Sequence, residues 1–157
     1  MRIISSDLAD FLRDTFMLEW RGIHGSLHWA RVRANGLYLA ERNGANARVV
    51  ELFAFLHDAR REHDGSDLEH GRRSAQLARD LSGRFFSLSG DEVELLDWAC
   101  RDHSAGELDA DITVQTCWDA DRLDLGRVGI RPQPERLCTP EARDHIAAAF
   151  ERSRRGW

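Results

Sequence analysis

The pair His57-Asp58 is a place in this sequence where the residue types could do chemistry. It follows the segment VVELFAFL, residues 49–56, which is apolar nearly all round and is typical of a buried helix. Burying an unpaired charge is costly. A metal ion would satisfy both side chains, and so would a capping bond with a salt bridge to Arg60 or Arg61. The pair alone leaves both interpretations open.

A second pair, His63-Asp64, lies a short way along the chain in a polar stretch that ends at Gly65. This setting favours a solvated turn beside any site rather than a metal ligand. Asp64 could still orient an attacking water from such a loop. Asp67 follows, and capping of the next helix is its expected role.

Other histidines and aspartates fall on inward faces of expected helices. Asp121 is the one charge on an apolar stripe, whereas Asp119 shares its face with polar residues and is expected to be solvated. The other three lie on separate helices: His103 aligns with Leu96, Ala99 and Cys100, His70 with Ser74, Leu77 and Leu81, and His28 with Arg31 and Asn35. Helix bundles build metal sites from such facing side chains. Histidine and carboxylate without thiolate favour Mn, Fe, Co, Mg or Zn.

The elements that must position these residues are helices. Helix formers and 3.6-residue periodicity dominate, and no convincing alternating strand appears. We predict an all-α, multi-helix bundle in a single domain, residues 1–157, with about seven helices at 6–18, 26–42, 46–59, 67–83, 90–102, 112–125 and 140–154. Residues 126–138 form the longest irregular stretch, and a loop of that length is often functional.

Composition excludes several classes of function. The 157 residues carry a net charge of -5, so no nucleic acid polymer is expected as partner. All 22 basic residues are arginine, which excludes a lysine nucleophile. Three scattered cysteines fit neither a disulfide framework nor a cysteine zinc site. No apolar run is long enough for a membrane helix, and no signal peptide is recognisable. We expect a cytoplasmic protein of unknown oligomeric state.

The ordered set His28, His57-Asp58 and Asp121 resembles the H…HD…D pattern of the HD-domain superfamily of metal-dependent phosphohydrolases. The segments HWARV, FAFLHD and DADRLD, which begin at residues 28, 53 and 119, look like that family's motifs. EHGRRSA and DHSAG, which contain His70 and His103, resemble the extra histidine segments of its small bacterial members. The similarity covers roughly residues 20–130, followed by a C-terminal helix at about 140–154. It implies that the four ligands converge on one divalent cation.

The resemblance also implies a mechanism. The cation would act as a Lewis acid on a phosphoryl group and supply a water that ionises near neutral pH, with Asp58 serving in catalysis as well as binding. His70 and His103 could bind a second metal ion, or they could support the ligands from behind or transfer protons, and the latter roles are preferred. Three arginines, Arg60, Arg61 and Arg122, could bind the phosphate or pair with the liganding aspartates.

The expected substrate is a nucleotide or other small phosphorylated metabolite. Two alternatives to a phosphohydrolase stay open. One is a non-catalytic metal- or nucleotide-binding module with a sensing role. The other is a purely structural helical protein whose inward histidines and aspartates pair with one another.

Overall fold

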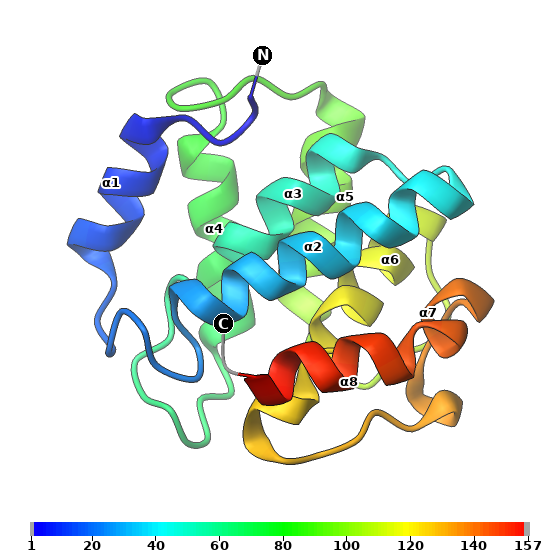
Figure 1. Cartoon of the computed structure of the whole chain (residues 1–157). Helices are drawn as coiled ribbons and strands as arrows, with labels where there is room; N and C mark the ends of the chain where they lie inside the picture. Colours follow the sequence, from blue (N-terminus) through cyan, green and yellow to red (C-terminus); the bar gives the residue numbers. More distant parts are fainter. Residues whose placement is uncertain (1, 156–157) are drawn as a thin grey trace.

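The computed structural model describes residues 2–155, which fold into helices joined by short loops (Figure 1). The described chain contains eight α-helices: α1 Ser6–Thr15, α2 Ser26–Asn43, α3 Ala47–Leu56, α4 His70–Leu81, α5 Gly90–Asp102, α6 Ile112–Arg122, α7 Pro140–Asp144 and α8 Ile146–Arg155. Two 3-10 helices, η1 Leu125–Val128 and η2 Pro134–Arg136, lie between α6 and α7. The predicted all-α fold is confirmed.

Local capping explains where several helices begin. The Asn46 side chain accepts from the backbone of Arg48 and Val49 at the start of α3. Ser89 and Glu92 form a reciprocal capping box at the start of α5, and Thr139 caps α7. The differences from prediction lie mostly at helix ends. The helix predicted at 140–154 is broken at His145, and the one predicted to end at residue 125 stops at Arg122.

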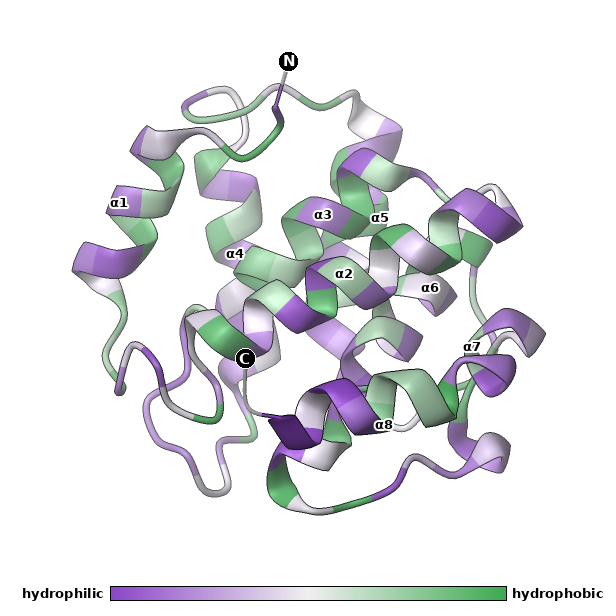
Figure 2. Ribbon diagram, in the orientation of Figure 1, coloured by the Kyte–Doolittle hydropathy of each residue, from purple (hydrophilic) through white to green (hydrophobic). Residues whose placement is uncertain are grey.

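Helix α3 lies at the centre of the bundle and contacts α2, α4, α5 and α6. Six of its ten residues are buried, which agrees with its apolar sequence. Figure 2 shows hydrophobic colours on much of α3, whereas α1 and α8 alternate between hydrophobic and hydrophilic. The turn that follows Leu56, the last residue of α3, therefore lies in the middle of the protein.

Two glycines allow the helices around α3 to pack closely. A Cβ on Gly71 would lie 2.6 Å from the carbonyl oxygen of Arg101, so α4 can approach the end of α5 only without a side chain here. A Cβ on Gly36 would lie 2.4 Å from a methyl of Val50, where α2 meets α3. These contacts bring the helices that carry the inward histidines together.

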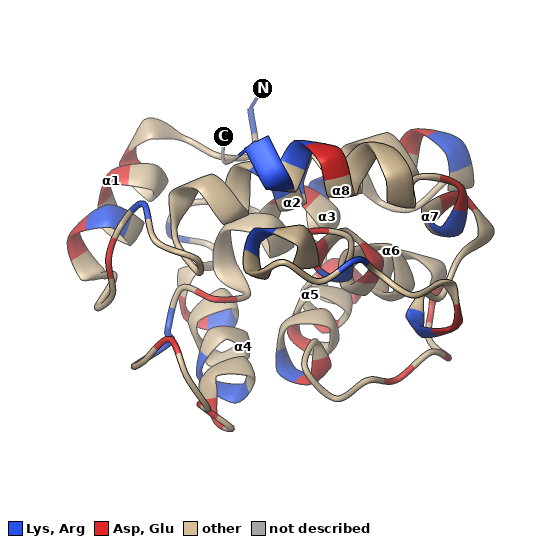
Figure 3. Cartoon of the chain, turned by 60° about the horizontal axis from the view of Figure 1, so that its bottom comes forward, with Lys and Arg blue, Asp and Glu red and all other residues tan. Residues whose placement is uncertain are grey.

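Charged residues of both signs are spread over the outer surfaces. In the view of Figure 3, arginine and acidic segments alternate along α1, α5 and α8. Within residues 2–155, no helix has the length and apolar character needed to cross a membrane.

Candidate metal centre

His57 and Asp58 lie in the turn directly after α3. The Phe53 carbonyl accepts from both the backbone N–H and the Nδ1 of His57, each at 3.0 Å. The Ser74 hydroxyl on α4 donates to the His57 carbonyl at 2.7 Å. The turn is thus fixed from two helices, and both side chains are buried.

Four residues form what we call the first half-site: His28, His57, Asp58 and Asp121. The Nε2 atoms of His28 and His57 lie 3.0 Å apart. Asp58 Oδ2 lies 3.4 Å from each of these nitrogens. Asp121 Oδ1 lies 3.2 Å from His28 Nε2 and 3.5 Å from His57 Nε2. The structure therefore brings together all four residues predicted as metal ligands.

The other oxygen of Asp58 faces a second group of histidines. Asp58 Oδ1 lies 3.4 Å from His70 Nε2 and 3.5 Å from His103 Nε2. These two nitrogens lie 2.9 Å apart, and the Ser104 hydroxyl lies 3.4 Å from His70 Nε2. We call Asp58, His70 and His103 the second half-site, and the Asp58 carboxylate belongs to both.

The Nδ1 atom of every one of these histidines is already committed to an oxygen acceptor. For three of them the acceptor is a backbone carbonyl: Phe53 for His57 at 3.0 Å, Asp67 for His70 at 2.5 Å and Cys100 for His103 at 2.7 Å. A carbonyl oxygen can only accept, so Nδ1 must carry the proton. When such a ring carries no second proton, it presents a lone pair at Nε2, which is how histidines that bind metals are commonly held.

The converging Nε2 atoms therefore require a cation. Two lone pairs 3 Å apart, facing carboxylate oxygens, repel unless a proton or a metal ion lies among them. An ion bound at about 2.0–2.2 Å from each ligand atom places neighbouring ligands about 3.0–3.5 Å apart in tetrahedral or octahedral geometry. The observed separations of 2.9–3.5 Å match that range in both half-sites.

The pKa shifts in the first half-site also indicate that a positive charge is stabilised there. Burial and the Arg127 charge lower the pKa of His28, but hydrogen bonds to the surrounding carboxylates outweigh them and raise it to about 9. Burial raises the pKa of Asp58, yet the His57 charge and the bonds from its histidine neighbours hold it well below its usual range. Similar contacts lower the pKa of Asp121. Without a metal ion, a proton on His28 fills the role of the cation.

Asp124 belongs to the centre, although the sequence did not single it out. Its Oδ2 accepts from His28 Nδ1 at 2.7 Å, and its Oδ1 accepts from Arg31 Nε at 2.7 Å. Both partners are buried. A carboxylate behind a histidine fixes the ring and makes Nε2 more basic. Asp124 lies just after the end of α6, so helical spacing gave no signal for it.

Two predictions about neighbouring aspartates are wrong. Asp119 is fully buried instead of solvated: it accepts from the backbone N–H groups of Cys138 and Thr139 at 2.7 and 2.8 Å. Burial raises its pKa in spite of these bonds. Asp67 does not cap α4, because its carboxylate accepts from Arg73 and the Glu62 backbone.

Asp64 lies in the loop beside the centre and bonds to a different histidine. Its Oδ1 lies 2.8 Å from Nδ1 of the buried His24, while Asp64 itself is half exposed. His63 is exposed, as expected for a solvated turn. The structure thus separates the two His-Asp pairs and joins Asp64 to the loop that precedes α2.

The three arginines considered for phosphate binding have different surroundings. Arg60 donates to the Thr15 hydroxyl and lies against Phe11, so it is directed to α1. Arg61 pairs with Asp58 at 3.2 Å and holds the following loop through its carbonyls. Arg122 donates to the Arg136 and Glu107 carbonyls beside a cavity. Arg122 therefore stays a candidate for binding phosphate, whereas Arg61 pairs with Asp58.

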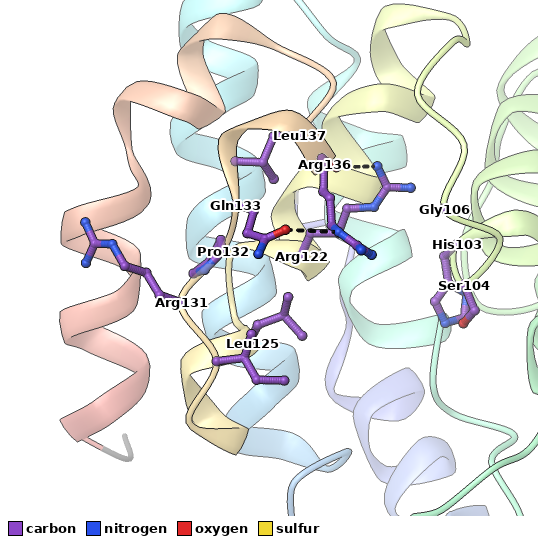
Figure 4. A pocket seen from close by; sticks show the side chains of 11 residues that line it. His103, Ser104, Gly106, Arg122, Leu125, Arg131, Pro132, Gln133, Arg136 and Leu137 are labelled. Atoms are coloured by element: carbon purple, nitrogen blue, oxygen red, sulfur yellow. Dashed lines mark hydrogen bonds between the residues drawn. The ribbon is translucent and has the colours of Figure 1, made fainter.

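That cavity, of about 510 Å³, extends from the second half-site under the 126–138 segment. Figure 4 shows His103 and Ser104 on one side and Gln133, Arg122 and Arg136 facing them. Its wall includes the apolar residues Leu125, Ile130, Pro132 and Leu137. The long segment picked out from the sequence therefore forms much of a cavity that reaches His103 of the second half-site.

Comparison with known proteins supports this description of the fold. No family model matches the sequence, and no curated protein matches it either. The structure is similar to the crystal structure of a predicted HD superfamily hydrolase from an uncultured Thermotogales bacterium. The TM-score is 0.73 with 24% identity, over 92% of this chain and 84% of that one. The predicted resemblance to the HD superfamily is confirmed at the level of the fold.

Proposed function

We propose that this protein is a metal-dependent phosphohydrolase that acts on a nucleotide or another small phosphate ester. The observation that carries the proposal is the convergence of four histidine Nε2 acceptors on the two oxygens of one buried aspartate. His28, His57, Asp58 and Asp121 would hold one divalent ion, and Asp58, His70 and His103 a second. Bound ions would supply Lewis acidity and a water that ionises near neutral pH.

The protein's own side chains would hold these ions in place and neutralise the substrate. Asp124 orients His28 through Nδ1, and Arg61 balances one oxygen of Asp58. Ser104 lies beside His70, where its hydroxyl can orient a phosphate oxygen. Arg122 adds positive charge at the cavity wall. A hydrolase role agrees with the fold, and the choice of a phosphate ester as substrate is our inference.

A purely structural role for the histidines fits less well. Side chains that served only to pair with one another would not need every Nδ1 proton directed away from the cluster. Three backbone carbonyls and Asp124 do this for all four rings. This arrangement leaves every Nε2 available to one centre, which favours a metal ion.

The test is a panel of phosphate esters and nucleotides assayed with Mn, Co and Mg. We expect metal-dependent release of phosphate that chelation abolishes and metal restores. The variant Asp58→Ala should lose that turnover. Turnover that survives in Asp58→Ala, or an absence of turnover with any ester although metal is bound, would contradict a phosphohydrolase and favour a binding module.

A further inference from the structure

The cavity beside the second half-site has an unusual charge composition. Arg122, Arg131 and Arg136 are among its eleven lining residues, and no aspartate or glutamate lines it. The whole chain holds 27 acidic residues against 22 arginines. A purely positive cavity in an acidic protein is a feature that attracts anions.

These arginines also lack carboxylate partners. Arg31, Arg61 and Arg73 each pair with an aspartate. Within residues 2–155, no acidic side chain lies within 4.0 Å of the charged nitrogens of Arg122, Arg131 or Arg136. Their positive charge is therefore not neutralised inside the protein.

The two arginines that face the cavity differ in how firmly they are held. Arg122 donates through both Nη atoms to backbone carbonyls and lies over the Trp118 ring, so its position is fixed. Arg136 is exposed and donates only through Nε, to Gln133 Oε1 at 3.2 Å. Both of its Nη groups stay available for a bidentate contact with a carboxylate or a phosphate.

Arg131 provides a comparison on the same segment. Its guanidinium lies 5.3 Å from the Phe150 ring centroid on α8. Figure 4 shows it directed away from Gln133 and Arg136. Arg131 therefore carries the same charge as Arg136 and also borders the cavity, but its guanidinium lies against Phe150 and points away from Arg136.

The rest of the cavity wall suits the short, compact carbon skeleton of a small substrate. Leu125, Ile130 and Leu137 provide apolar contact, and Gln133 adds one amide. Among residues 2–155, no Trp, Phe or Tyr lines the cavity, and Trp29 and Trp118 lie in the core. The described part of the wall thus offers the His103 imidazole but no larger aromatic ring on which a nucleobase could stack.

We infer that the cavity selects phosphate esters that carry a second anionic group, a carboxylate or a further phosphate, and that Arg136 binds that group. The inference rests on the proposed function, because the scissile phosphate would lie at the metal centre. His103 and Ser104 belong both to the cavity and to the second half-site. A molecule held at that centre therefore extends toward the arginines.

The experiment uses matched pairs of esters with the Mn-loaded protein. The pairs are 3-phosphoglycerate with glycerol 3-phosphate, and adenosine 3′,5′-bisphosphate with adenosine 5′-monophosphate. The two pairs separate a carboxylate from a phosphate as the second group. We expect KM to be about tenfold lower for the doubly anionic member of at least one pair, which is the effect of one charge-assisted bidentate contact.

Arg136→Gln should reduce that preference to less than about twofold, and the control Arg131→Gln should leave it unchanged. Equal KM values within both pairs would overturn the inference, as would equal losses in the two variants. A phosphohydrolase that hydrolyses esters without this preference would refute the inference alone.

If no ester is hydrolysed, the proposed function fails, and calorimetric titration of the metal-loaded protein with 3-phosphoglycerate and adenosine 3′,5′-bisphosphate still tests the cavity. Binding of either probe that Arg136→Gln weakens and Arg131→Gln preserves would support the anion site. An absence of binding for both probes would refute it.

Discussion

The two sides of Asp58 are alike in ligand type but differ in charge. The first half-site adds the Asp121 carboxylate, and its His28 ring is backed by Asp124. The second half-site has no carboxylate besides Asp58 within the described residues, and neutral carbonyls back His70 and His103. The second half-site also borders the cavity. We expect the first half-site to retain its ion and the second to exchange ions and contact substrate.

The largest effect should come from the residue that both half-sites share. Asp58→Asn removes a negative charge from two ion positions. A bound metal ion lowers the barrier to hydrolysis by several kcal/mol. We therefore expect turnover to fall by about a thousandfold or more when the ions are lost. Metal content after dialysis should fall in parallel.

Asp64→Asn is the matched control for this change, since Asp64 lies in the adjacent loop but bonds to His24. It should keep its metal and retain turnover within about threefold, as substitutions away from the centre usually do. Full metal content in Asp58→Asn, with native circular dichroism, would show that Asp58 does not bridge the half-sites.

Comparison of His28→Asn with His70→Asn separates the half-sites from each other. The first variant should lose the tightly bound ion. The second should keep one ion after dialysis and lose only the weaker equivalent, with a fall in turnover of about 10- to 100-fold. Mass spectrometry of the native protein counts the ions. Loss of the same ion in both variants would indicate a single metal position.

Asp124→Asn tests whether the contact behind His28 strengthens the first half-site. The amide can still accept from Nδ1 but without a charge, so the ring becomes less basic. We expect metal affinity of the first half-site to fall by about 10- to 100-fold, while the second half-site is unaffected. Calorimetric titration with Mn measures both affinities, and an equal change in the two would contradict the assignment.

The smallest effect should be a pH dependence of the metal-free protein. The pKa of His28 is raised from 6.5 to about 9 in the folded state. A raised pKa gives stability that is fully present below pH 6.5 and is lost as pH rises through 9. A metal ion displaces this proton, so affinity at the first half-site should increase over the same range.

Urea unfolding of the chelator-treated protein at pH 6 and pH 9 measures this change. The His28→Asn variant should show a smaller difference between the two pH values. Equal stability of the wild-type protein at both values, together with a metal affinity that does not change with pH, would refute the assigned role of His28.

Sequence patterns predicted which histidines and aspartates converge, because helical spacing shows which side chains point inward. His28, His70 and Asp121 lie on regular helices, where that rule holds. Asp124 follows the end of α6 at Arg122, where 3.6-residue spacing no longer applies. It could be recognised only from the contact with His28, which is 96 residues away.

The burial of Asp119 and the roles of the arginines depend on long-range contacts in the same way. Asp119 is buried because the segment after η2 folds back and presents the backbone of Cys138 and Thr139. Arg136 faces the cavity for a related reason, since η2 places it opposite His103. Nearest neighbours in sequence, such as Arg60 and Asp58, do not reveal which side chain meets which.

We propose above all that Asp58 would hold one metal ion in each half-site, with a different carboxylate oxygen directed to each. Anomalous diffraction from crystals grown with Mn²⁺ tests it most directly. We expect two anomalous peaks, one bounded by His28, His57 and Asp121 and the other by His70 and His103, with one Asp58 oxygen directed to each. An absence of peaks in this cluster, or a single peak with the His70 and His103 rings still bonded to each other, would contradict it.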